Sequence, residues 1–138
     1  MLKRRSIAGV VKKNDAGEYW LTGGYTTQKR FLRATEIFQP KTRSFSPGPA
    51  LPIAIYGHCV VQTSASKFIV IGGVKHGNTF LSTVRQYDFD TNTWSLLASM
   101  PIPQQPFESC HLSTQGTDIL VGGKECHSNT VSCCNYCH

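Results

Sequence analysis

Long apolar runs are absent from this sequence. None of its 138 residues lies in a stretch approaching the roughly 20 apolar residues of a transmembrane helix. The N-terminal run, residues 7–11, is shorter than the roughly 7 to 15 apolar residues of a signal peptide. The chain therefore predicts no membrane partner and shows no secretion signal. A cytoplasmic location is the default expectation, and a secreted parent protein is the alternative.

Acidic residues are also scarce. Eight Asp and Glu stand against 14 Lys and Arg, which gives a net charge of +6. The excess is concentrated in residues 1–43, which hold ten Lys or Arg and three acids. Lys29, Arg30 and Arg33 lie in a predicted loop between two strands, without the alternating aromatic residues of a single-strand binding platform, so nucleic-acid binding is not expected.

Catalytic motifs are missing as well. There is no Gly-x-Ser-x-Gly nucleophile motif and no phosphate-binding loop. Asp88 and Asp90 lie in a predicted turn, where such residues bond to their own backbone. His58 and His111 stand at the starts of predicted strands and are interpreted as structural groups. The sequence predicts a protein that is not an enzyme and has no cofactor.

Glycine pairs recur at a fixed spacing. Each pair follows a short apolar run, and successive pairs are 49 and 50 residues apart. The pairs are Gly23-Gly24, Gly72-Gly73 and Gly122-Gly123. Such runs are typical of strands buried on both faces, and glycine ends a strand well because it adopts a positive φ at little cost. A period of roughly 50 residues indicates a repeat architecture.

Aromatic residues recur at the same period. Tyr87 and Trp94 are seven residues apart, and Phe38 and Phe45 occupy the corresponding places 49 residues earlier. A segment rich in turn-forming residues separates the members of each pair. Because large aromatic side chains are typically buried, we expect all four to pack between neighbouring repeats.

The order of these features resembles the kelch repeat, in which an apolar strand ends in Gly-Gly and is followed by an aromatic residue, a spaced Trp and a Pro-containing loop. The resemblance covers roughly residues 18–125 and is stronger in the second copy, because Phe replaces both Tyr and Trp in the first. It implies an all-β fold of kelch-type β-propeller blades, each a four-stranded antiparallel sheet. A closed ring needs about 4 to 8 blades, so an incomplete ring is expected.

The expected organisation has three parts. Residues 1–17 form a poorly structured basic segment. Kelch repeats follow as a partial blade at 18–52, a full blade at 53–101 and a partial blade at 102–125. Residues 126–138 form a Cys/His-rich tail, interpreted as a truncated strand. Because such a stack leaves strand edges unpaired, we expect either a fragment of a larger propeller protein or self-association through the open edges.

The resemblance implies a non-catalytic protein–protein interaction module whose partner is unknown. Many kelch proteins resemble substrate receptors of ubiquitin ligases, a role that would need an adaptor domain beyond this sequence. Two alternatives stay open. One is part of a galactose-oxidase-like propeller enzyme, which holds copper with Tyr and His ligands from several blades. The other is an extracellular kelch protein with disulfides.

Loops are the expected binding surface, because loops vary while the blades hold them rigid. The candidates are two loops of the second copy, residues 53–56 and 75–81. Their candidate contact residues are Tyr56, Lys75, His76 and Phe80.

Four of the six cysteines lie in the last thirteen residues. The alternative interpretation of this tail is a zinc site formed by Cys126, His127, Cys134 and Cys137. A single close cysteine pair does not define such a site, so the main expectation is no metal. Cys59 and Cys110 are interpreted as small buried residues, although the even cysteine count also fits disulfides.

Overall fold

The computed structural model describes residues 9–13, 17–100, 104–112, 118–125 and 131–137, with side chains described up to residue 100. These residues form strands joined by turns and loops, which confirms the all-β fold. Within these ranges there is no helix that could cross a membrane.

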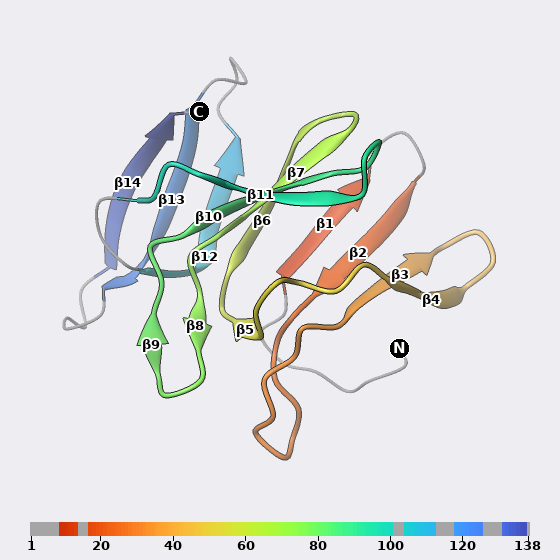
Figure 1. Cartoon of the computed structure of the whole chain (residues 1–138), viewed down its shortest axis with the longest axis horizontal. Coiled ribbons are helices and arrows are strands. Elements are labelled where there is room, and N and C mark those ends of the chain that lie inside the picture. The colour runs from red at the N-terminus through yellow and green to blue at the C-terminus, as the bar shows by residue number, and fades with distance from the viewer. Residues whose placement is uncertain (1–8, 14–16, 101–103, 113–117, 126–130, 138) are drawn as a thin grey trace.

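Three antiparallel sheets follow one another along the chain (Figure 1). The first consists of β1 (Gly9–Lys13), β2 (Glu18–Thr22), β3 (Thr35–Gln39) and β4 (Ser44–Gly48). The second consists of β6 (Cys59–Ser64), β7 (Lys67–Ile71), β10 (Val84–Asp88) and β11 (Thr93–Leu97). The third consists of β12 (Gln104–Leu112), β13 (Asp118–Glu125) and β14 (Val131–Cys137). We call each of these sheets a blade.

A small additional sheet lies at one end of the blades. It consists of β5 (Ile55–Tyr56), β8 (Val74–Lys75) and β9 (Thr79–Phe80), with β8 in the middle. Strand β5 belongs to the connection between the first two blades, whereas β8 and β9 form a hairpin that extends from the second. This sheet therefore ties the first connection to the second blade.

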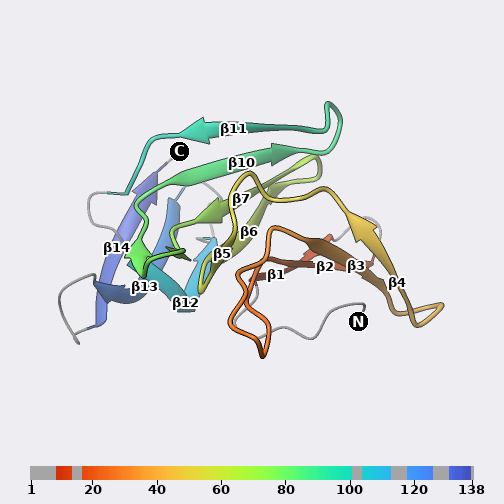
Figure 2. The same ribbon diagram turned by 60° about the horizontal axis from the view of Figure 1, so that its bottom comes forward.

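The blades are arranged as an open arc. Strand β6 contacts both β1 and β12, so the first strands of the three blades lie side by side. Figures 1 and 2 show the blades fanning out from these strands in chain order without closing a ring. This is the incomplete propeller that the repeat spacing predicts.

Strand β1 corrects the expected start of the first blade. Residues 9–13 pair with β2 in antiparallel register, with Val11 opposite Trp20. The N-terminal segment is therefore structured from residue 9, and the first blade has four strands rather than the three expected. Val11 is buried whereas Val10 is 54% exposed, which is the alternation of an amphipathic strand. The lysines that follow hide this short pattern in the sequence.

The two complete blades repeat their loop hydrogen bonds with a period of 49. The amide of Leu32 donates to the carbonyl of Gly24 at 2.9 Å, and Leu81 donates to Gly73 at the same distance. The next pair of equivalent bonds runs from Leu51 to Arg33 and from Met100 to Ser82, both at 2.8 Å. The 49-residue period therefore holds for the backbone hydrogen bonds of the connections as well as for the apolar pattern of the strands.

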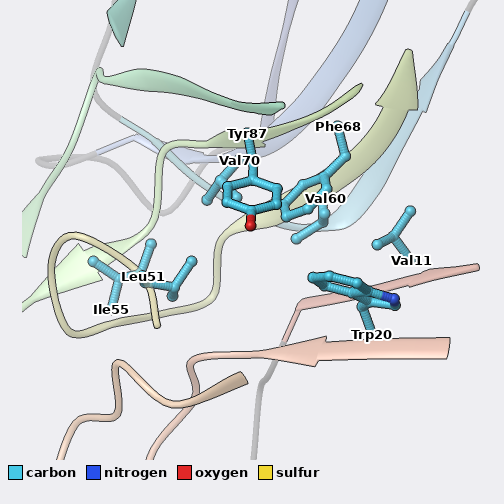
Figure 3. Close-up of a cluster of buried hydrophobic side chains, with 8 residues drawn as sticks. All are labelled: Val11, Trp20, Leu51, Ile55, Val60, Phe68, Val70 and Tyr87. Carbon is cyan, nitrogen blue, oxygen red and sulfur yellow. The ribbon is translucent and has the colours of Figure 1, made fainter. Parts of the chain in front are cut away.

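An aromatic and aliphatic core joins the first two blades (Figure 3). Trp20 of β2 meets Phe68 of β7 at 5.8 Å between ring centroids, and Tyr87 of β10 lies 5.4 Å from Phe68. Trp94 completes this contact, because its Nε1 donates a 3.1 Å hydrogen bond to the carbonyl of Ala50 in the first connection. Tyr87 and Trp94 thus lie at the boundary between the blades.

Phe38 and Phe45 behave differently. Both are half-buried, and their centroids lie 4.8 Å apart. Among the described residues their only ring contact is with each other. They occupy the face of the first blade that points away from the second, so they lack the neighbour that Tyr87 and Trp94 have.

The other face of the second blade carries a separate core. Its buried members are Cys59, Val61, Ile69, Ile71, Val84 and Met100. Since β6 also contacts β12, this core faces the third blade. Cys59 is disulfide-bonded, so the interpretation of this residue as a free buried thiol is corrected.

Candidate functional site

The connection from β2 to β3 folds into a tight hairpin. Tyr25 and Phe31 form an antiparallel bridge. Within the bridge, the amide of Thr26 donates to the carbonyl of Arg30 at 2.9 Å, and the amide of Lys29 donates to the carbonyl of Thr26 at 2.9 Å. Lys29 at the tip has a φ of 57°, in the left-handed region. The hairpin therefore holds its two aromatic rings on a backbone fixed by hydrogen bonds.

The β8–β9 hairpin is the equivalent element of the second blade. Asn78 at its tip has a φ of 56° and lies 49 residues after Lys29. Phe80 lies 49 residues after Phe31. The two hairpins are thus copies of one element, placed side by side on successive blades.

A pocket of about 220 Å³ lies between these hairpins. Tyr25, Phe31 and Tyr56 provide its rings, and Lys29 and Asn78 provide its polar groups. Tyr56 meets Tyr25 at 5.2 Å and Phe31 at 4.9 Å between centroids, both in edge-to-face geometry. All three rings are half-buried, so they support one another and still present surface to the pocket.

Tyr56 is placed by a close approach of two backbones. The amide of Gly24 donates a 2.8 Å hydrogen bond to the carbonyl of Ile55, the residue before Tyr56. A Cβ atom on Gly23 would lie only 2.6 Å from that carbonyl oxygen, and Gly23 has a φ of 60°. The first glycine pair therefore has a function beyond ending β2, because it lets β5 approach closely enough to complete the pocket.

His76 extends the aromatic cluster at the edge of the pocket. Its ring lies 5.8 Å from that of Phe31 and is exposed. His76 comes from the second blade and Phe31 from the first, so the contact spans the boundary between the blades.

The charge around the pocket has one sign. Three connections at this end of the blades are residues 23–34, 49–58 and 72–83, and we call these three the pocket end. They contain Lys29, Arg30, Arg33 and Lys75, and no Asp or Glu. The turns at the opposite end, which we call the turn end, carry both signs, for example Asp90 and Lys41.

Arg33 has a structural contact. Its Nε donates a 2.8 Å hydrogen bond to the carbonyl of Leu51. Lys29 and Arg30, by contrast, are exposed at the hairpin tip, and Lys29 lines the pocket.

His58 lies beneath the pocket end and is a structural group. It is buried between the blades, and its Nε2 lies 2.8 Å from Oγ1 of Thr22. Burial lowers its pKa from 6.5 to about 4, although a hydrogen bond with the backbone of Thr22 acts in the opposite direction. The imidazole is therefore neutral near pH 7 and serves the contact between the blades.

The residues predicted from sequence are distributed unevenly around this site. Tyr56 lines the pocket, and His76 contacts it through Phe31. Lys75 pairs with Ile55 in the small sheet and does not line the pocket. Phe80 is not in the lining either, because it is the copy of Phe31 one blade further on and belongs to the next boundary.

Three pocket residues, Tyr25, Lys29 and Phe31, lie outside the loops predicted from sequence. Asn78 lies within the candidate loop 75–81 but is not among its candidate contact residues. The available signal was the 49-residue spacing, since Phe31 and Phe80 are equivalent and only Phe80 was selected.

The residues of the alternative zinc site lie outside the described side chains. The described side chains contain no cluster of three His, Cys, Asp or Glu that could hold a metal ion. Cys134 and Cys137 lie in β14, where only the backbone is described, and Cys126 and His127 lie outside the described residues.

Comparison with known proteins finds a kelch motif in part of the chain. The family model of the kelch motif matches residues 56–101. A kelch repeat-containing protein of Dictyostelium discoideum is 29% identical over 93 residues, which covers 66% of this chain and 14% of that protein. Kelch-like protein 35 of Mus musculus is 28% identical over 107 residues, which covers 78% of this chain and 18% of that protein. The chain thus matches less than a fifth of either relative.

Proposed function

Because residues 56–101 match the kelch motif, we propose that the chain is a non-catalytic module that binds a partner protein through its pocket end. The observation that carries the proposal is the set of half-buried rings between the two hairpins. Aromatic rings at a concave site, held on a fixed backbone, are suited to the central contact of a protein interface.

The rigidity of the hairpins supports this proposal. Each hairpin is braced by repeated backbone hydrogen bonds, and the small sheet links the first connection to the second blade. Little conformational entropy is lost when such pre-organised loops bind, which favours affinity. The turn end offers a weaker surface, since its turn residues are mostly small and polar.

Site-specific photo-cross-linking tests the proposal. Benzoylphenylalanine replaces Thr27, an exposed residue of the pocket end, or Thr91, an exposed residue of the turn end. We expect a discrete cross-linked protein in extracts of the source cells from position 27 only. Excess unlabelled wild-type chain should abolish the product, whereas excess Tyr56→Ala chain should not.

Equal products from both positions, or equal competition by both chains, would contradict the proposal. Circular dichroism of the Tyr56→Ala chain checks that the competitor is folded.

A further inference from the structure

We propose that the pocket receives one aromatic side chain from an acidic segment of the partner, whose flanking carboxylates lie against Lys29 and Arg30. This inference rests on the proposed function and adds the chemistry of the occupant. It combines the size of the pocket, the character of its walls and the charge of its surroundings.

The size of the pocket favours a single side chain of a partner as its occupant. Its volume of about 220 Å³ is below the roughly 300–1,000 Å³ of sites that enclose a whole small molecule. One large side chain of a partner fits such a volume, with its backbone remaining outside.

The walls of the pocket select an aromatic ring. Tyr25 and Phe31 both meet Tyr56 edge-to-face, with interplanar angles of 74° and 65°. Rings set at steep angles present both edges and faces, and an inserted ring can therefore make offset and edge-to-face contacts with more than one of them. A cationic side chain would also be attracted to these faces, but it would be repelled by Lys29 in the lining.

The surroundings of the pocket select acidic flanking residues. Lys29 and Arg30 are exposed and adjacent, and no Asp or Glu occurs in the three connections of the pocket end. Carboxylates of a bound segment would lie within a Debye length of about 10 Å at 0.1 M salt, so their attraction would be only partly screened.

A single-stranded nucleic acid also combines aromatic rings with negative charge. Proteins that bind it use a groove that follows the backbone over about 4 to 16 nucleotides. The pocket is a single hollow between two hairpins, which favours a peptide anchor. Nucleic-acid binding is therefore kept as an outcome of the test.

Fluorescence anisotropy with the full 138-residue chain provides the test. The probes are the labelled peptide Gly-Glu-Glu-Trp-Glu-Glu-Gly, a version with Ala for Trp, a version with Gln for every Glu, and labelled oligouridylate. We expect the first peptide to bind, with affinity falling about tenfold without the Trp and about fivefold without the carboxylates. Raising the salt from about 0.05 M to about 0.2 M should weaken only the peptides that carry Glu.

Two matched pairs of variants locate the binding. Lys29→Glu should weaken the acidic peptide, whereas Lys41→Glu makes the same change of charge at an exposed site of the turn end and should not. Phe31→Ala should weaken it, whereas Phe80→Ala truncates the equivalent ring outside the pocket and should not. If Phe31→Ala is unfolded by circular dichroism, the lysine pair decides.

Three results would overturn the inference: equal binding of the Trp and Ala peptides, equal effects within the lysine pair, or tighter binding of oligouridylate than of the acidic peptide. If one of these results is obtained while cross-linking remains confined to position 27, the pocket end is still the proposed binding surface. The proposed chemistry of its occupant is then rejected.

Discussion

The hydroxyl of Tyr87 donates a 2.9 Å hydrogen bond to Oδ1 of Asn92, the left-handed residue of the turn between β10 and β11. Burial, together with the negative charge of Asp88, raises the pKa of Tyr87, so the hydroxyl keeps its proton near pH 7. The first blade has Phe38 and Arg43 at the equivalent positions. Arg43 has the same left-handed backbone, with a φ of 51°, but Phe38 has no hydroxyl to bond it.

This difference predicts that the first blade can be stabilised by copying the second. Arg43→Asn should raise the free energy of unfolding by about 0.5–1 kcal/mol, because Asn tolerates a left-handed backbone better than Arg does. Adding Phe38→Tyr should contribute about 1 kcal/mol more through the new hydrogen bond. Urea unfolding of both single variants and the double variant measures this coupling. Additive effects of the two substitutions would contradict it, and Lys41→Asn controls for the change at an exposed site.

His58 predicts a loss of stability in acid. Its pKa is about 4 in the folded chain and 6.5 in the unfolded chain, so protonation favours unfolding. The stabilisation is complete above pH 6.5 and is lost as the pH falls towards 4, by an amount on the order of 3 kcal/mol. Urea unfolding between pH 7.5 and pH 4 measures the slope of the free energy of unfolding against pH.

Asparagine at position 58 removes this titration and should flatten the slope, whereas His76→Gln removes an exposed imidazole and should leave it unchanged. An identical slope for wild type and His58→Asn would show that other groups cause the acid sensitivity.

The close packing around Gly23 predicts that one added methyl group strongly destabilises the fold. Ala at this position combines a left-handed backbone with a Cβ 2.6 Å from the carbonyl oxygen of Ile55. We expect Gly23→Ala to lower the free energy of unfolding by about 3 kcal/mol or more. Gly17→Ala is the matched control, since its φ of 66° is similar but no atom lies within 4 Å of the added Cβ. It should cost only about 1 kcal/mol. Equal losses of unfolding free energy would mean that β5 does not approach Gly23 closely.

Cys59 predicts a covalent link between the second and third blades. It is disulfide-bonded and belongs to the core on the side of β12, and Cys110 is the cysteine that β12 carries. We expect non-reducing peptide mapping by mass spectrometry to recover residues 59 and 110 in one disulfide-linked peptide pair. Recovery of Cys59 with a cysteine of β14, or as a free thiol, would contradict this pairing.

Much of the fold could be predicted from the sequence because each blade repeats the same local chemistry. Lys67–Ile71 is a continuous apolar run and forms β7, in which all residues but the first are buried. Strand β1 could not be predicted, because only alternate positions of this short strand are buried and lysines follow them. Pairing with β2 determines its structure, and such long-range pairing leaves little signal in a short segment.

The site was only partly predictable for a similar reason. The sequence predicts Tyr56 and His76 as contact residues because they lie in loops of the better-matched second copy. The pocket needs Tyr25 and Phe31 from the first blade as well, and these rings meet Tyr56 only after β5 packs against the hairpin between β2 and β3. Single-loop inspection does not reveal such a contact between repeats, whereas aligning Phe31 with Phe80 at 49 residues would have suggested it.

Covalent footprinting of the aromatic side chains, with and without the partner captured from position 27, tests whether the pocket end is the binding surface. We expect Tyr25, Phe31 and Tyr56 to be protected from labelling when the partner is bound. Phe38 and Phe45, which are also half-buried but lie in the first blade away from the pocket end, should label equally in both states. Protection of that pair, with unchanged labelling of the pocket rings, would contradict the claim that the pocket end is the binding surface.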